Sequence, residues 1–302
     1  MKLFFYKKVF FPGVFGLIVC FSSCKEKLGN TFHHQIISQQ LLNTTEAFHI
    51  NNIETYKINY ISDDLAIEGY IAKPKQTQAN SKLPAIVFCR GGNQSYGMIL
   101  PNSLNYLNFL ASEGYVVLAS QLRGNIASEG VDEFGGKDLN DILKLISIAR
   151  DLDFVDPRNI HVLGYSRGGM NTYQISKLTN NINSLAVVGA PSNLFEGARF
   201  RQEMYDNVMK PLIGDSIQFK NEYIKRSAVY WHNKINKPVL ILHGTDDKAV
   251  TLKEAQQIID SLKISNKTEF QYEIFEGGNH SLSNFKQRRN DLIFNWFNTH
   301  NK

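Results

Sequence analysis

The chain has 302 residues, of which 43% are hydrophobic and 20% are charged, and this balance is typical of one large globular domain. It excludes a low-complexity or disordered chain. The formal net charge of +5 falls to +2 without residues 1–23, which hold three lysines and no acid. We therefore expect no nucleic-acid partner.

Residues 1–23 resemble a bacterial signal peptide with a lipoprotein cleavage box. Three lysines precede the apolar stretch Val9–Phe21, and Ser22-Ser23-Cys24 follows it. This stretch is shorter than the about 20 residues that a transmembrane anchor needs. We expect a cleaved leader at 1–23 and a lipid on Cys24 that attaches the protein to a membrane of the cell envelope, facing the periplasm or the outside. The polar residues 24–50 are expected to form a tether with one short helix.

Strands that alternate with helices are predicted from residue 53 onward. Residues 53–72 alternate about a turn at 62–64, as antiparallel strands do. Continuous apolar runs, typical of strands buried on both faces, follow and alternate with helical patterns. The expected strands are 84–89, 115–120, 160–163, 184–189, 238–242 and 270–275, and the expected helices are 98–112, 137–151, 252–262 and 284–299. This order predicts an α/β fold with a mostly parallel central sheet and helices on both faces.

The alternation breaks once, between residues 192 and 232. This segment is rich in aromatic residues and lacks a strand pattern. We interpret it as a small helical insertion that packs over the carboxyl edge of the sheet, inside a catalytic domain that spans 51–302. Loops at the carboxyl ends of parallel strands are where sites form in such folds.

A nucleophile elbow is predicted at Gly164-Tyr165-Ser166-Arg167-Gly168-Gly169. An apolar strand leads into this turn and a helical pattern leaves it, which is the setting that the motif requires. Gly164 and Gly168 flank Ser166 at the positions where a side chain would collide across a tight bend. The hydroxyl of Ser166 is therefore expected at the sheet edge, above a helix N-terminus.

A serine nucleophile needs a base and an acid that orients the base. His280 follows the last predicted strand in the sequence Gly-Gly-Asn-His and is the expected base. The turn His-Gly-Thr-Asp-Asp at 243–247 offers two acids, and its spacing favours Asp247. Asp246 is expected to cap the turn or face solvent, and His243 to hold the loop. The order Ser, Asp, His is the order found in α/β-hydrolases.

Two backbone regions are expected to stabilise an oxyanion. One donor is the N–H of Arg167, directly after the nucleophile, and the second comes from the loop that holds Arg90 and Gly91. Arg90 could assist the oxyanion, bind a substrate carboxylate, or pair with an acid such as Glu129 or Asp132. We expect no metal and no cofactor.

Residues from about 54 to 300 resemble the catalytic domain of the prolyl oligopeptidase family of serine peptidases, and of related α/β-hydrolases. The segments that carry the resemblance stand in order at 134–141, 156–160, 164–169, 238–247 and 277–280. The resemblance implies an α/β-hydrolase fold with Ser166 as nucleophile, Asp247 as acid and His280 as base. Family members often carry Tyr or His where Arg90 stands, so the sequence departs from the pattern there.

We expect a serine hydrolase that cleaves an acyl bond of a small peptide or ester through an acyl-enzyme. A peptidase is the first interpretation. A carboxylic or carbohydrate (acetyl) esterase is the alternative, because we expect no β-propeller such as precedes the catalytic domain in the family's large peptidases. A non-catalytic surface-binding lipoprotein is disfavoured, since all three triad positions hold the required residue types. The sequence leaves the oligomeric state open.

Overall fold

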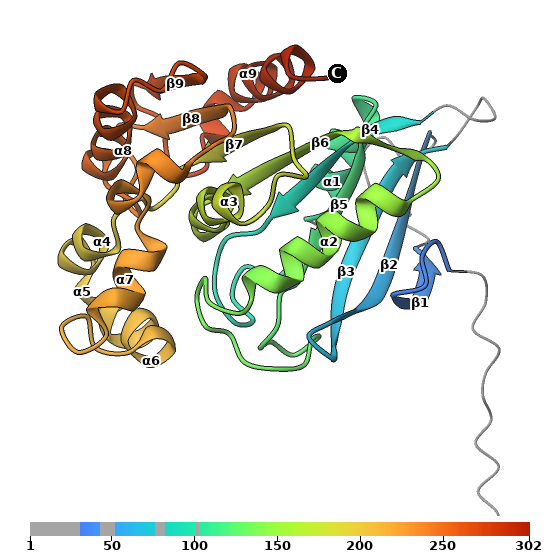
Figure 1. Ribbon diagram of the computed structural model, residues 1–302, viewed down its shortest axis with the longest axis horizontal. Coiled ribbons are helices and arrows are strands. Elements are labelled where there is room, and N and C mark those ends of the chain that lie inside the picture. The colour runs from blue at the N-terminus through green and yellow to red at the C-terminus, as the bar shows by residue number, and fades with distance from the viewer. Residues whose placement is uncertain (1–30, 43–51, 76–81, 101–102) are drawn as a thin grey trace, which may run out of the picture.

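One nine-stranded sheet runs through the computed structural model, which describes residues 31–42, 52–75, 82–100 and 103–302 (Figure 1). The strand order is β1-β2-β3-β5-β4-β6-β7-β8-β9, antiparallel from β1 through β3 to β5 and parallel from β5 onward. The strands are β1 (Ile36–Leu41), β2 (Ile53–Ser62), β3 (Leu65–Pro74), β4 (Leu83–Cys89), β5 (Val116–Ser120), β6 (Val155–Tyr165), β7 (Ser184–Val188), β8 (Val239–Gly244) and β9 (Phe270–Phe275). The expected leader at 1–23 and the lipid site at Cys24 lie outside the described residues.

Helices cover both faces of the sheet, because successive side chains of a strand point to opposite faces. In β4, Val87 packs into a core with α2, α3 and α8, whereas Ile86 packs into a core with α1 and α9. The helices are α1 (Leu104–Ser112), α2 (Leu139–Asp151), α3 (Arg167–Leu178), α8 (Leu252–Ile264) and α9 (Lys286–Thr299). The predicted α/β-hydrolase fold, with a mostly parallel sheet between two helical layers, is confirmed.

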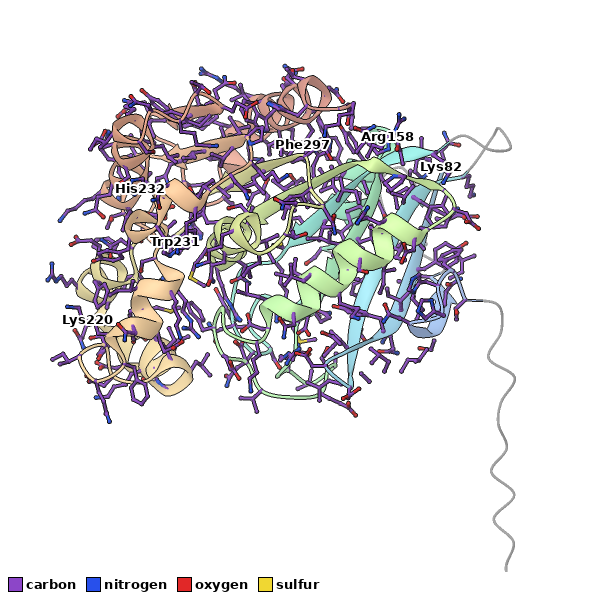
Figure 2. The ribbon with its side chains drawn as sticks, in the orientation of Figure 1. Lys82, Arg158, Lys220, Trp231, His232 and Phe297 are labelled. Carbon is purple, nitrogen blue, oxygen red and sulfur yellow. The ribbon has the colours of Figure 1, made fainter. Side chains whose placement is uncertain are left out.

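Short helices connect β7 to β8 in the segment where the sequence alternation breaks. They are α4 (Leu194–Phe200), α5 (Gln202–Met204), a π-helical turn at 205–209, α6 (Lys210–Ile213), α7 (Lys220–Arg226) and two 3₁₀ turns at 228–230 and 232–234. Their apolar side chains form a third, smaller core with Phe134 and Met170. Figure 2 shows Lys220 on the outer side of this insertion and Trp231 where the chain returns toward the sheet. The Trp231 ring lies 3.6 Å from Nζ of Lys177, which joins the insertion to α3.

Residues 36–41 form a strand, so the expected tether with a short helix is wrong for this part of 24–50. β1 pairs antiparallel with β2 at the edge of the sheet. Ile36 is the buried residue of β1, and Phe32 packs edge-on against Tyr56 just before the strand. A polar edge strand is held by backbone hydrogen bonds and buries few side chains. Its sequence therefore carries little of the alternation that identifies strands.

The expected helix at 98–112 is shorter in the structure and begins at Leu104. Leu100 precedes a proline in the sequence, and the residue before a proline is disfavoured in helical conformation. None of the helices in the described ranges combines the length and apolar character needed to cross a membrane.

The edge strand yields a stability prediction. Ile36 is 1% exposed and Ile37 is 39% exposed on the same strand. Ile36→Ala should lower the free energy of unfolding by about 2–4 kcal/mol, because it removes buried methyl groups and leaves a cavity. Ile37→Ala, the control, should change it by less than about 0.5 kcal/mol. Urea unfolding measures both, and equal losses would show that β1 is not packed as described.

Candidate active site

Ser166 occupies a sharp turn between β6 and α3. Its φ is 54° and its ψ is −127°, a conformation that side-chain-bearing residues seldom adopt. The backbone N–H of Ser166 donates a hydrogen bond of 2.9 Å to the carbonyl of Val188 at the end of β7. Strained backbone of this kind persists only where the surroundings hold it, and it is concentrated at functional sites. The strand-turn-helix setting of the predicted elbow is present.

Glycine is required on both sides of the elbow. A Cβ on Gly168 would overlap the backbone carbonyl of Cys89 at the end of β4, and one on Gly164 would overlap Gly168 and the hydroxyl of Thr172. The elbow can therefore approach the neighbouring strand closely only without side chains at these positions. The reason that the sequence suggested for the two glycines agrees with these contacts.

Asp247 and His280 come from the loops after β8 and β9 and form a hydrogen-bonded pair. Nδ1 of His280 lies 2.7 Å from Oδ2 of Asp247. The Asp247 side chain is fully buried, and that of His280 is 32% exposed. Burial would raise the pKa of Asp247, but the bond to His280 and two backbone N–H groups from the same loop outweigh it and lower this pKa below its usual value. Asp246 is exposed, as expected.

Two neighbours shape the Asp247–His280 pair. Nε2 of His243 lies 3.0 Å from the carbonyl of Val250, so His243 closes the loop that carries Asp247. Gly189, with φ of +56°, directly follows β7, and a Cβ there would stand 3.0 Å from Nδ1 of His280 and 3.1 Å from Oδ2 of Asp247. Sequence analysis placed Gly189 at the end of the expected strand 184–189 and gave it no role at the site.

The side chain of Arg167 ties two loops together beneath the elbow. Its guanidinium donates to both carboxylate oxygens of Asp132, to Asp138 at 2.8 Å and to the carbonyl of Gly92 at 3.1 Å. Arg167 and both acids are buried. Burial would lower the pKa of Arg167, but Asp138 and Asp132 raise it above its usual value. The sequence suggested a backbone role for Arg167 and did not reveal this buried network.

The structure does not bring the Arg90 side chain to the site. Its guanidinium donates to the backbone carbonyls of Gly91, Gln94, Tyr96 and Gln121 at 2.8–3.2 Å. Within the described residues it forms no ion pair with Glu129 or Asp132, both of which the sequence had offered as partners. Burial, with Arg167 nearby, lowers the pKa of Arg90 to about 10. Arg90 therefore organises the loop that follows β4 and does not face the cavity.

Gly91 does approach the nucleophile. A Cβ on Gly91 would lie 3.1 Å from Cβ of Ser166 and 3.2 Å from the carbonyl oxygen of Tyr165. The loop backbone thus passes close to the elbow. Gly91 and Arg167, the two backbone positions expected to serve the oxyanion, are therefore both neighbours of Ser166.

A cavity of about 550 Å³ opens over the elbow. Ser166, Arg167, His280 and Gly91 line it together, so the structure brings the candidate nucleophile and base to one space. Most of the remaining wall is apolar and comes from the insertion and the adjoining loops, with Tyr96, Phe134, Pro191, Leu194, Met204, Met209 and Val250. A cavity of this size accommodates a small organic substrate and presents few polar groups to it.

Comparisons with known proteins point to one family. The model of the prolyl oligopeptidase family matches residues 102–302. The uncharacterized peptidase YtmA of Bacillus subtilis is 29% identical over 72% of this chain and 82% of its own length. The uncharacterized peptidase YuxL of the same bacterium is 27% identical over 81% of this chain and 39% of its own length. The chain thus spans about two fifths of the length of some of the curated relatives it matches.

Solved structures share the fold. An acylaminoacyl peptidase of Pyrococcus horikoshii superposes with a TM-score of 0.70 at 23% identity, over 84% of this chain and 42% of that one. An esterase of Pyrococcus furiosus superposes with a TM-score of 0.64 at 17% identity, over 83% of this chain and 92% of that one. The family match covers both the elbow and the Asp247–His280 pair. The chain belongs to the prolyl oligopeptidase family and is a serine hydrolase.

Proposed function

We propose that this chain is a serine peptidase that cleaves an acyl bond through a covalent acyl-enzyme. The observation that carries the proposal is the shared cavity of Ser166 and His280, with Asp247 hydrogen-bonded to Nδ1 of the imidazole. Oγ of Ser166 attacks the carbonyl carbon while His280 takes its proton, then passes it to the departing amine. Water, deprotonated in turn by His280, hydrolyses the acyl-enzyme and restores Ser166.

Asp247 and the backbone donors complete the proposed mechanism. Asp247 fixes the tautomer in which Nδ1 of His280 carries hydrogen and Nε2 is free to accept the serine proton. The N–H groups of Arg167 and Gly91 stabilise the negative oxygen that forms during attack. The contacts of Gly91 with the elbow support its part in this role. The buried network of Arg167 and the loop contacts of Arg90 keep both donors in place without touching the substrate.

An esterase is the second candidate, and a specific observation favours it. An acetyl xylan esterase of Paenibacillus superposes with a TM-score of 0.67 over 88% of its own length, as the P. furiosus esterase does over 92%. The acylaminoacyl peptidase matches over only 42% of its chain. Parallel assays of aminoacyl 4-nitroanilides, short acyl 4-nitrophenyl esters and acetylated sugars separate the two activities, and efficient turnover of esters alone would replace peptidase by esterase.

We further propose that Cys24 carries a lipid that holds the protein on a membrane of the bacterial cell envelope. Support comes from the sequence: a lysine-rich start, a short apolar stretch and a cysteine at its end. A single lipid chain gives only weak attachment, so a stable anchor at Cys24 would need a second chain or a second membrane signal.

Ser166→Ala tests the nucleophile. Turnover should fall by about four to six orders of magnitude, because no other group can form the acyl-enzyme. A fluorophosphonate probe should label the wild-type protein and leave the variant unlabelled. Circular dichroism should show an unchanged fold. A variant that still labels fully would place the nucleophile elsewhere.

Asp247→Asn and Asp246→Asn form a matched pair. Asp247→Asn should reduce kcat by about three to four orders of magnitude, because an amide no longer favours the required imidazole tautomer or its charged form. Asp246→Asn, an exposed neighbour, should leave kcat within about twofold. Steady-state kinetics of both variants on one substrate measures the two kcat values. The opposite ranking would mean that the acid has been assigned to the wrong residue.

The anchor is tested by fractionation. The native protein should sediment with membranes, and Cys24→Ala, exported through a cleavable signal of the non-lipoprotein kind, should be recovered in the soluble fraction. Both forms should have the same kcat, since the described domain begins beyond this segment. Recovery of the native protein in the cytoplasmic fraction would contradict the proposed localisation.

A further inference from the structure

Glu254 is a buried acid in the wall of the cavity that holds Ser166. It lies in the first turn of α8 and is 1% exposed. Its Oε2 accepts hydrogen bonds of 3.1 Å from the backbone N–H groups of Ser192 and Asn193, at the start of the insertion. These bonds fix the orientation of the carboxylate. The proposed chemistry of Ser166, Asp247 and His280 makes no use of it.

The second oxygen of Glu254 faces Gly197 of α4. Gly197 also lines the cavity, and a Cβ at this position would stand 3.6 Å from Oε1 of Glu254. That separation is ordinary van der Waals contact, so any side chain longer than that of alanine would cover the oxygen. Because residue 197 is glycine, it places no side chain between Oε1 of Glu254 and the cavity that both residues line.

No basic side chain among the described residues forms an ion pair with Glu254. Its neighbour Glu196 differs, since it pairs with Lys253 at 2.7 Å and with Arg199 at 3.2 Å. Burial raises the pKa of Glu254 to about 7 against the effect of its two N–H donors, and the nearby Glu196 and Asp247 add to the rise. Burial disfavours the ionised form of this acid, and a cation brought in by a ligand would stabilise it.

The other charged side chains around the cavity do not neutralise this acid. Arg167 is already paired with Asp132 and Asp138 beneath the elbow. Arg201 lines the cavity but is exposed, so it lies where the cavity opens to solvent. The buried part of the wall is otherwise mostly apolar. Glu254 is thus the group there that an incoming cation would meet.

We propose that Glu254 is a specificity-determining residue that binds an ammonium or guanidinium group of the substrate. The inference rests on the proposed function, because the cation must belong to a substrate whose carbonyl reaches Ser166. Two sources share this chemistry: a lysine or arginine side chain, and a free amino terminus. Charge-assisted hydrogen bonds of this kind discriminate strongly against analogues that lack the cation.

Matched substrates test the proposal. The first pair, Nα-acetyl-lysyl and Nα-acetyl-norleucyl 4-nitroanilide, differs in the ammonium group at the end of the side chain. The second pair, leucyl and Nα-acetyl-leucyl 4-nitroanilide, differs in the free amino terminus. The matching thioesters extend the test to an enzyme that cleaves only esters. The wild-type protein should prefer the cationic member of one pair by about ten- to a hundredfold in kcat/KM, the range of a hydrogen bond to a charged group. The pair that shows the preference identifies the source of the cation.

Glu254→Gln should bring that preference close to one by lowering kcat/KM for the cationic member, because glutamine keeps an oxygen for the two backbone N–H groups but carries no charge. Glu196→Gln is the control: it removes an acid that is already paired, and the preference should persist. Gly197→Leu covers Oε1 while leaving Glu254 in place, and it should also abolish the preference. This second variant decides the matter if Glu254→Gln does not fold.

Two negative results are distinguishable. Equal kcat/KM for both members of each pair in the wild-type protein, or a preference that survives in Glu254→Gln or in Gly197→Leu, would overturn this inference alone. Absence of Ser166-dependent turnover of every anilide and thioester would overturn the proposed function and this inference with it.

Discussion

The buried ion pairs of Arg167 are the interaction on which the site depends. One guanidinium meets two carboxylates, and these acids belong to the long loop between β5 and α2. Burying such charges is unfavourable unless every partner is present, and removing one partner of a buried pair costs about 3–5 kcal/mol. Asp132 also accepts the N–H of Gln94, which connects the network to the loop after β4. Two loops distant in the sequence are therefore held at the elbow by one side chain.

This arrangement links folding to the proposed catalysis. The residue whose guanidinium closes the network is also the residue that follows Ser166, so its backbone N–H is placed by the same contacts that stabilise the loops. Arg90 adds to these contacts, because its guanidinium donates hydrogen bonds to four backbone carbonyls around Gly91. Donors held this firmly need not reorganise as charge develops in the transition state, which is the condition for effective electrostatic stabilisation.

Local rules explain what could be predicted from the sequence. The strands of the parallel sheet are continuous apolar runs, and the two glycines of the elbow follow from a steric limit within five residues. Asp247 and His280 stand directly after strands, so the topology of the sheet alone brings them to one edge. These features need no knowledge of partners elsewhere in the chain.

Features that depend on distant partners escaped prediction. Arg90 and Arg167 are both arginines beside glycines, and nothing local reveals that one binds carbonyls and the other binds two aspartates. In the sequence, Glu254 looks like an ordinary acid in the first turn of a helix. Only the structure shows that it lines the cavity beside Gly197. The strand at 36–41 was missed because its stability comes from pairing with β2.

If Cys24 carries the proposed lipid, the position of β1 limits how far the domain can lie from the membrane. Phe32, which packs against Tyr56 and Phe154, already belongs to the folded body, and His33 beside it is buried. Seven residues, 25–31, separate this point from Cys24, the proposed lipid site. Even a fully extended chain of that length reaches at most about 30 Å. A domain attached to the lipid through so short a segment would stay in the layer of solution next to the bilayer. It would meet only substrates that enter this layer.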